Sequence, residues 1–393
     1  MYIIFFIFIF FFFYNFAILF WPVFQLLSIP SGFYSIPTLC IAALCSTQFF
    51  FQTAKKKLLL RELLFIVIAW APWLIYLAYR CDFDDPYSYK KFILMSIGQF
   101  GTILMICCAF YKDKEKFVKY FYICTIAMIS IVLVYFFFNH SVYSIQGVKI
   151  KGRLGTEGVN PIEMSRMFAI GALSLMLWGR FSYWIKVVLC IPFFIGMILT
   201  GSRGPVISVS IVLACHYLWT QSQHRLIAIR LFLSCVLLII ALWTVGAYFQ
   251  DPIDKYFTRG HRQGMYQGSG RYSAALVTWK EFVSEPFWGV GLGKYGKPGT
   301  QASPTIDLSN KPINRDYPHN ILYEVAAELG IVGIILFIFL LRPGAWVFDF
   351  SNKFIYLFFL CFLFAMTSGD FFDNAGVFTF AYIARLNRKP KVE

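Results

Sequence analysis

The sequence predicts an all-α polytopic integral membrane protein, and three observations lead to this fold class. Of the 393 residues, 59% are hydrophobic, 20% are aromatic and only 14% are charged, whereas soluble domains carry about 25% charged residues. The apolar residues come in runs of about 18 or more, which is long enough for a helix to cross a bilayer. The charged residues fall in short clusters between these runs. We therefore expect a single membrane domain over residues 1–393.

The apolar runs predict about 12 transmembrane helices. The first run has no basic flank and no small-residue cleavage site, so we interpret it as a retained helix and not as a signal peptide. The last is short and polar for a span. In chain order the predicted spans are residues 6–28, 34–53, 62–79, 92–110, 118–138, 162–179, 185–200, 204–219, 231–249, 319–341, 354–368 and 374–386.

The positions of Lys and Arg predict the orientation of the chain, because short cytoplasmic loops are enriched in these residues. With twelve spans, all of the basic clusters in short loops fall on one side, to which we assign both termini and the cytoplasm. The long segments 139–161 and 250–318 then lie on the outer side. The clusters are found around residues 55–61, 112–119, 180–186, 225–230, 342–353 and 385–391.

Two other classes of function are disfavoured by composition. A net charge of +15 is compatible with nucleic-acid binding, but its distribution fits orientation signals better, so we expect no nucleic-acid partner. The ten cysteines follow no metal or disulfide spacing. Most lie singly in apolar runs, where cysteine behaves as a small hydrophobic residue.

The outer loop 250–318 is long for a compact membrane protein, and connections of this length are usually functional. Its stretch "SGRYSAALVTWKEFVSEPF" predicts an amphipathic helix on the membrane surface, with Trp279 at the headgroups. Arg271 is in the first turn of this helix, where the helix dipole opposes a cation, so we expect an anionic ligand nearby. The apolar positions at helical spacing are Tyr272, Leu276, Trp279 and Val283.

Several polar residues are predicted on the same outer side. Arg203, in "TGSRGP", lies in a turn between two spans, where it either snorkels to headgroups or grips a phosphate at the mouth of a cavity. Arg153, Asn160 and Arg166 belong to "KIKGRLGTEGVNPIEMSRM", which is either a solvated loop or a substrate contact. Asp370, in "SGDFFDN", belongs to a polar turn or orients the outer arginines.

His319 is the strongest single candidate for a catalytic residue. A lone histidine is more often structural, but this one follows Pro318 and opens the predicted span 319–341, with Asn320 next to it. A helix N-terminus disfavours the imidazolium, which keeps the ring neutral and able to accept a proton. The nearby "GVGLGKYG" lacks the spacing of a phosphate-binding loop, so we expect a glycine-rich turn there.

Four stretches, taken in order, resemble the O-antigen ligase and polymerase superfamily over roughly residues 150–340. They are "GRLGTEGVNPIEMSRM", "LTGSRGP", "GSGRYSAALVTWKEFVSEPFWGVGLG" and "YPHNILYEVAAELGIVGIILF". The predicted span count and the long outer loop between the ninth and tenth spans match as well. The resemblance implies a GT-C-like enzyme of the bacterial inner membrane, with both termini cytoplasmic and its site facing the periplasm.

The resemblance also implies a reaction. An inverting, metal-independent glycosyltransferase without a cofactor would move a glycan from undecaprenyl diphosphate to a sugar hydroxyl. Arg203 and Arg271 would hold the diphosphate, and His319 would act on the acceptor hydroxyl as a base or by positioning it. This division of labour is chemically sound, because cations stabilise a leaving diphosphate and a base activates a hydroxyl. The implied substrate-binding residues are Arg153, Asn160, Arg166, Asn320 and Asp370.

Two acceptors are compatible with this chemistry. A polymerase would use another lipid-linked repeat unit, and a ligase would use the lipid A core; we favour the polymerase, with a chain-length regulator as a further partner beside the lipid bilayer. A transporter for an anionic solute or a lipid-linked glycan remains an alternative of another class. The sequence shows no internal repeat and few charges in the middle of its spans, which disfavours that alternative.

Overall fold

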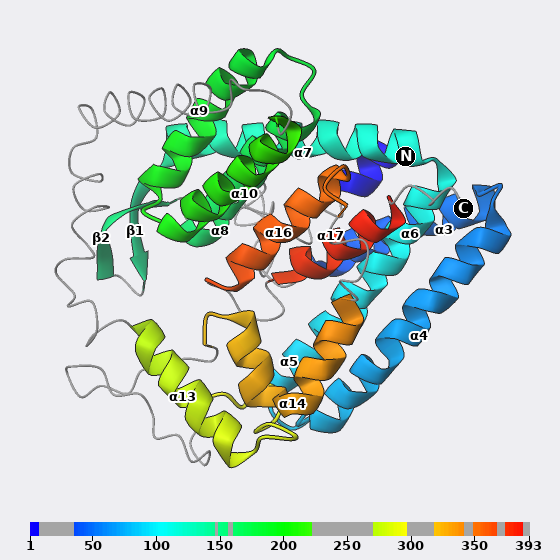
Figure 1. Cartoon of the computed structure of the whole chain (residues 1–393), viewed down its shortest axis with the longest axis vertical. Helices are drawn as coiled ribbons and strands as arrows, with labels where there is room; N and C mark the ends of the chain where they lie inside the picture. The colour runs from blue at the N-terminus through cyan, green and yellow to red at the C-terminus, as the bar shows by residue number, and fades with distance from the viewer. Residues whose placement is uncertain are drawn as a thin grey trace. The chain divides into compact units, whose positions relative to one another are not determined.

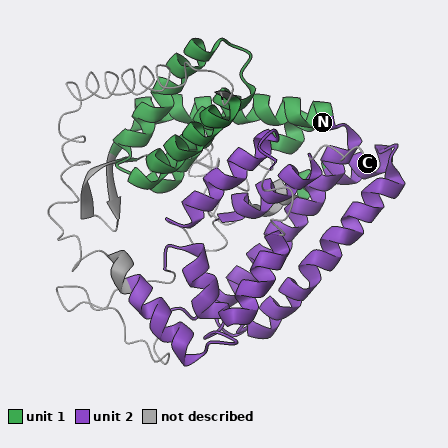
Figure 2. Cartoon of the chain, viewed as in Figure 1, with its two compact units in different colours: residues 1–45, 115–259 green, residues 46–114, 260–393 purple. Residues whose placement is uncertain are grey.

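The computed structural model describes residues 1–7, 35–145, 148–155, 160–221, 270–296, 318–341, 349–367 and 374–387. Helices dominate these residues, and the strands described there form one two-stranded hairpin (Figure 1). The chain divides into two compact units (Figure 2). Unit 1 comprises residues 1–45 and 115–259, and unit 2 comprises residues 46–114 and 260–393.

Within the described residues, four helical stretches are long and apolar enough to cross a membrane, which confirms the prediction of an all-α, multi-pass membrane protein. Several shorter apolar helices coincide with further predicted spans. The predicted span 231–249, and nearly all of 6–28, lie outside the described residues. The four long stretches are Lys56–Arg80, Pro86–Lys112, Lys114–Asn139 and Ile321–Leu341.

Unit 1 is built on α8, which is buried along almost its whole length. Pro161 occupies its first turn, and the side chain of Asn160 caps it by accepting a hydrogen bond from the backbone N–H of Ile162 at 3.0 Å. Gly196 lets α9 approach closely, since an added Cβ would lie 2.8 Å from the ring of Phe168. The described helices of unit 1 include α7 (Lys114–Asn139), α8 (Pro161–Trp178), α9 (Tyr183–Leu199) and α10 (Arg203–Gln221).

An antiparallel hairpin of β1 (Ser141–Ile145) and β2 (Val148–Gly155) precedes α8. The sequence offered a solvated loop as one interpretation of this outer segment. Residues 148–155 form strand β2, and the hairpin pairs Ser141 with Gly155 and Ile145 with Val148. β2 also contacts α8 and α9 within the same unit.

Unit 2 has an aromatic core in which Trp70 and Trp73 of α4 are fully buried. The ring of Trp73 lies 6.3 Å from that of Phe337, and the rings of Phe337 and Phe378 lie 5.8 Å apart. These contacts tie α4 to α14 and α17. The helices are α3 (Ser35–Gln52, shared with unit 1), α4 (Lys56–Arg80), α5 (Pro86–Ile93), η2 (Leu94–Phe100), α6 (Gly101–Lys112), α13 (Gly270–Ser284), α14 (Ile321–Leu341), α16 (Lys353–Ala365) and α17 (Ala375–Leu386).

The span predicted over residues 319–341 is not one continuous helix, and this corrects the sequence-based expectation. Helix α14 begins at Ile321 and is interrupted at Gly330, whose φ of 63° and ψ of −161° are non-helical (Figure 1). The backbone N–H of Ile331 donates to Pro286 at 2.8 Å instead of continuing the helical ladder. We call residues 321–329 the first segment of α14 and residues 331–341 its second segment.

Candidate functional site

His319 lies at the start of α14, as the sequence predicted. Its φ is 59°, which is the left-handed conformation that a non-glycine residue adopts at some cost. Asn320 caps the helix, because its Oδ1 accepts hydrogen bonds from the backbone N–H groups of Leu322 at 3.0 Å and Tyr323 at 3.2 Å. Its Nδ2 donates to the carbonyl of Met366 at 3.1 Å, which anchors the cap to the end of α16.

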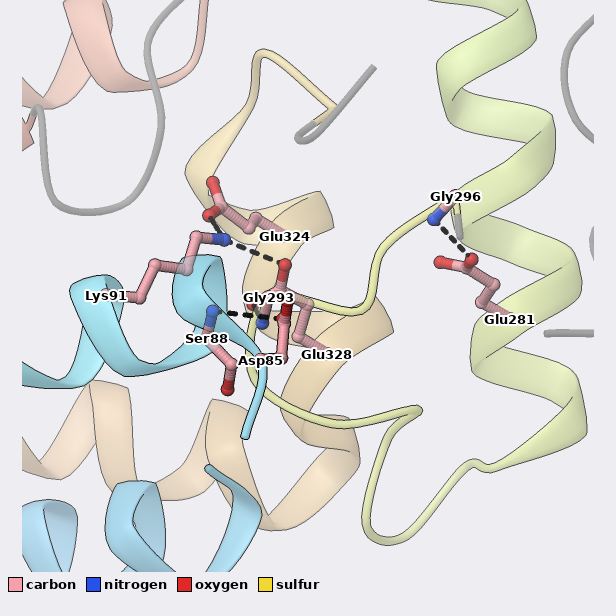
Figure 3. A network of polar contacts seen from close by, with 8 residues as sticks. All are labelled: Asp85, Ser88, Lys91, Glu281, Gly293, Gly296, Glu324 and Glu328. Atoms are coloured by element: carbon pink, nitrogen blue, oxygen red, sulfur yellow. Dashed lines mark hydrogen bonds and ion pairs between the residues drawn. The ribbon is translucent and has the colours of Figure 1, made fainter. Parts of the chain in front are cut away.

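A buried cluster of charges lies on the first segment of α14. The Lys91 Nζ of α5 donates to Oε1 of Glu324 at 2.5 Å and to Oε1 of Glu328 at 2.8 Å (Figure 3). The two glutamates are four residues apart and therefore share one face of the helix. All three side chains are at most 2% exposed. Charges at such depth are tolerated when they are paired, and they are often functional in membrane helices.

The stretch Gly289–Gly296, called the glycine loop here, packs against the same segment and confirms the predicted glycine-rich turn. Gly289, Gly291, Gly293 and Gly296 all have positive φ. The backbone N–H of Gly293 donates to Oε2 of Glu328 at 2.8 Å (Figure 3). A Cβ on Gly289 would lie 2.3 Å from the backbone carbon of Glu328, so only glycine allows this approach.

The glycine loop is also joined to the end of α4 and the turn that follows it. The backbone N–H of Leu292 donates to the carbonyl of Arg80 at 3.0 Å, and the Arg80 guanidinium donates back to the carbonyl of Gly289 at 2.5 Å. Lys294 pairs with Asp82 at 3.0 Å. The hydrogen bond from Lys294 lowers the pKa of the Asp82 carboxyl, which favours its ionised form.

Helix α13 confirms that the sequence stretch forms a helix, with Arg271 in its first turn. Ala274, Val277 and Glu281 are buried in unit 2. The Glu281 carboxylate accepts from the backbone N–H of Gly296 at 2.8 Å (Figure 3). Three residues of the predicted apolar stripe are exposed on the opposite side of the helix: Leu276, Trp279 and Val283.

The remaining predicted residues are distributed over both units. Arg203 is the first residue of α10, Arg166 lies in the second turn of α8, and Arg153 lies on β2, all in unit 1. Arg271 and His319 belong to unit 2, where α13 and α14 pack against each other. Asp370 lies outside the described residues.

Sequence reasoning missed the buried cluster of Lys91, Glu324 and Glu328. A signal for the two glutamates was present, because carboxylates four residues apart within a predicted span share one face and need a buried partner. Lys91 gave a weaker signal, since it follows another lysine just before a predicted span. Its burial depends on the contact between α5 and α14, which is distant in the sequence.

These features define a multi-pass membrane protein with an interrupted helix that is preceded by a histidine at its N-terminus. Residues 187–338 match the family model described as O-Antigen ligase (Wzy_C). The match runs from α9 into the second segment of α14 and encloses Arg203, Arg271 and His319. It confirms the resemblance to the O-antigen ligase and polymerase superfamily, and with the apolar helices it supports a multi-pass bacterial membrane protein. A comparison with curated proteins gives no match.

Proposed function

We propose that this protein is an inverting glycosyltransferase that moves a glycan from undecaprenyl diphosphate to a sugar hydroxyl. The reaction would take place at the periplasmic face of the bacterial inner membrane, with both termini in the cytoplasm. The observation that carries the proposal is the O-antigen ligase family match, because it encloses the three residues to which we assign the chemistry. The general class of glycosyl transfer follows from that match.

The proposed reaction is a single displacement at the anomeric carbon. The bond from this carbon to the diphosphate oxygen breaks, and a bond to the acceptor oxygen forms on the opposite face. His319 would take the proton of the acceptor hydroxyl, a role supported by its place at the N-terminus of α14, where a neutral imidazole is favoured. Arg203 and Arg271 would stabilise the negative charge that develops on the leaving diphosphate.

The other predicted residues would contact substrate around this centre. We assign this role to Arg153, Arg166 and Asp370, because cationic and carboxylate side chains suit a diphosphate and sugar hydroxyls. Asn160 and Asn320 each use the side-chain oxygen to cap a helix. Their contribution to binding would therefore come through the helix starts they fix, with the Asn160 amide group as the more available contact.

Helix α13 would lie on the outer surface of the bilayer. Trp279 is 64% exposed, and aromatic side chains concentrate at the membrane–water interface. Phe287 and Trp288 extend the exposed apolar surface, and the ring of Trp288 lies 6.3 Å from that of Tyr79 near the end of the membrane helix α4. This placement would hold Arg271 at the depth of lipid headgroups, where the diphosphate of a lipid-linked donor resides.

For the acceptor, we favour another lipid-linked repeat unit, which makes the protein a surface-polysaccharide polymerase acting with a chain-length regulator. This choice is supported by a resemblance to repeat-unit polymerases in two places. They are "YPHN" and "ELG" around α14, and "SGR", "W" and "PFWGVG" around α13. The second candidate is a ligase that transfers the polymer to the lipid A core, and the matched family is described as O-Antigen ligase.

Deletion of the coding sequence, followed by gel analysis of surface glycans, tests the proposal and separates these candidates. A core carrying one repeat unit identifies a polymerase. A bare core with long lipid-linked polymer accumulating identifies a ligase. Unchanged surface glycans together with lost uptake of an anionic solute would overturn the proposal in favour of a transporter.

A further inference from the structure

The charges buried between α5 and α14 form a cluster for which the proposed chemistry has no direct use. We call Lys91, Glu324 and Glu328 the ion cluster. Lys91 lies between the two carboxylates (Figure 3). Its Nζ is also 5.2 Å from the centre of the Tyr87 ring. Glu328 is fixed further by the Gly293 N–H, so one carboxylate bridges α5 and the glycine loop. Such an arrangement restricts rotation of the helix that carries both glutamates.

Because α14 is interrupted at Gly330, the orientation of its first segment depends on this restriction. The hydrogen-bond ladder of α14 does not run through Gly330, because Ile331 and Val332 donate to the carbonyls of Pro286 and Phe287 at 2.8 Å and 3.2 Å. Residues 321–329 are also shorter than the roughly 12–15 residues at which isolated helices become stable. The direction of the first segment therefore depends on its lateral contacts and not on the second segment.

Most of these lateral contacts lie towards the C-terminal end of the first segment. The backbone N–H groups of Val290 and Gly291 donate to the carbonyls of Ala327 and Glu328 at 2.9 Å and 3.0 Å. The Tyr76 hydroxyl donates to the carbonyl of Leu329 at 2.7 Å. Nearer the histidine, the Asn320 Nδ2 donates to the carbonyl of Met366 at 3.1 Å. Lys91 joins these two ends of the segment, because it reaches from Glu328 back to Glu324, one turn nearer the histidine.

The effect of a small tilt on the histidine follows from helix geometry. At 1.5 Å per residue, Ile321 lies about 10 Å along the axis from Glu328 and His319 lies beyond it, so a tilt of about 5° displaces His319 by about 1 Å. A misplacement of about 1 Å in a reacting group costs about 100-fold in rate. A clamp between Lys91 and both glutamates therefore limits displacements of about 1 Å, to which the rate of catalysis is sensitive.

We propose that Lys91 is a positioning residue, which holds the first segment of α14 through Glu324 and Glu328 and thereby sets the place of His319. The inference rests on the proposed function for the chemistry of His319. The clamp itself rests on the geometry of the ion cluster alone.

The test compares purified Lys91→Met with wild type in lipid nanodiscs, with Lys90→Met as the matched control, because Lys90 is the adjacent, exposed lysine. Hydrogen–deuterium exchange is measured over residues 318–329 and over residues 331–341. We expect exchange in Lys91→Met to be at least about tenfold faster over the first segment and unchanged over the second. Lys90→Met should match wild type in both.

Kinetics of glycan transfer to a lipid-linked acceptor provide the second readout. We expect kcat of Lys91→Met to fall by about 100-fold with the KM for the lipid-linked donor nearly unchanged. The transposed variant Lys91→Glu/Glu324→Lys retains one lysine and two glutamates and should recover most of kcat. If Lys91→Met does not fold, the neutral variant Lys91→Met/Glu324→Gln/Glu328→Gln takes its place, since removing the whole cluster leaves no unpaired buried charge.

Each outcome decides the inference. Unchanged exchange over residues 318–329 overturns the clamp, whatever the activity. Faster exchange with unchanged kcat overturns the positioning role. Absence of transfer by the wild-type protein overturns the proposed function and the positioning role with it, whereas the exchange comparison still reports on the clamp.

Discussion

Replacing Gly330 by alanine should destabilise the protein strongly, because the interruption of α14 leaves no room for a side chain. The added Cβ would lie 2.5 Å from the carbonyl oxygen of Phe287 and 2.7 Å from the backbone nitrogen of Gly289. Both atoms belong to the backbone, so no side-chain rotation relieves the clash. In addition, the φ of 63° and ψ of −161° are conformations that alanine rarely adopts.

The magnitude follows from these two effects. Holding a non-glycine residue in this region of φ and ψ costs about 1–3 kcal/mol. Moving residues 286–287 away breaks the hydrogen bonds from Ile331 and Val332, each with a net contribution of about 0.5–1.5 kcal/mol. We therefore expect Gly330→Ala to lose about 2–6 kcal/mol of stability, the sum of the two ranges.

Thermal unfolding of the purified protein in detergent measures this effect, and Gly101→Ala is the matched control. A Cβ on Gly101 meets nothing within 4 Å, and the residue is helical. Gly101→Ala should therefore unfold at or above the wild-type temperature, because alanine is the better helix former by about 1 kcal/mol. A Gly330→Ala protein as stable as wild type would refute the interrupted helix and the packing of the glycine loop against it.

Three further predictions concern the surroundings of the site. Asn320→Ala should lower stability by about 1 kcal/mol through loss of the α14 cap, and unchanged thermal unfolding would contradict the cap. Lys294→Met should remove the contribution of the Lys294–Asp82 ion pair to the free energy of unfolding, which is present while Asp82 is ionised. Because the folded-state pKa of Asp82 is lowered, this contribution is retained above the unfolded pKa of about 3.9 and lost as pH falls through the lower folded value. The difference between Lys294→Met and wild type in thermal unfolding should thus disappear in acid and shrink in high salt, and a difference that grows in acid would contradict the ion pair. A photo-reactive residue at Trp279 should crosslink to lipid, whereas one at the exposed Glu285 should not, and equal labelling would argue against the surface placement of α13.

The membrane helices were predictable because the thickness of the bilayer sets the length of an apolar run. Three predicted spans, 62–79, 92–110 and 118–138, lie inside long helices of the structure. The interruption at Gly330 was not predictable in this way, because the apolar run continues on both sides of the glycine. It depends on backbone contacts with Pro286 and Phe287, which are distant in the sequence.

In the candidate site, too, local features were predictable from the sequence and long-range contacts were not. The positions of Arg271 and His319 at helix starts were predictable, because glycine, proline and a capping asparagine mark helix boundaries locally. The ion cluster was missed, because a charge in the sequence does not reveal its partner. Only the packing of α5 against α14 shows that Lys91 belongs to Glu324 and Glu328.

The most direct test of the proposed transfer is the release of undecaprenyl diphosphate by purified protein in nanodiscs, supplied with a lipid-linked glycan donor and acceptor. The account predicts release matched by a lengthened glycan, a loss of at least about 100-fold in His319→Ala, and an unchanged rate in His140→Ala. His140 is an exposed histidine at the end of α7 and serves as the matched control. A wild-type rate in correctly folded His319→Ala would contradict the account.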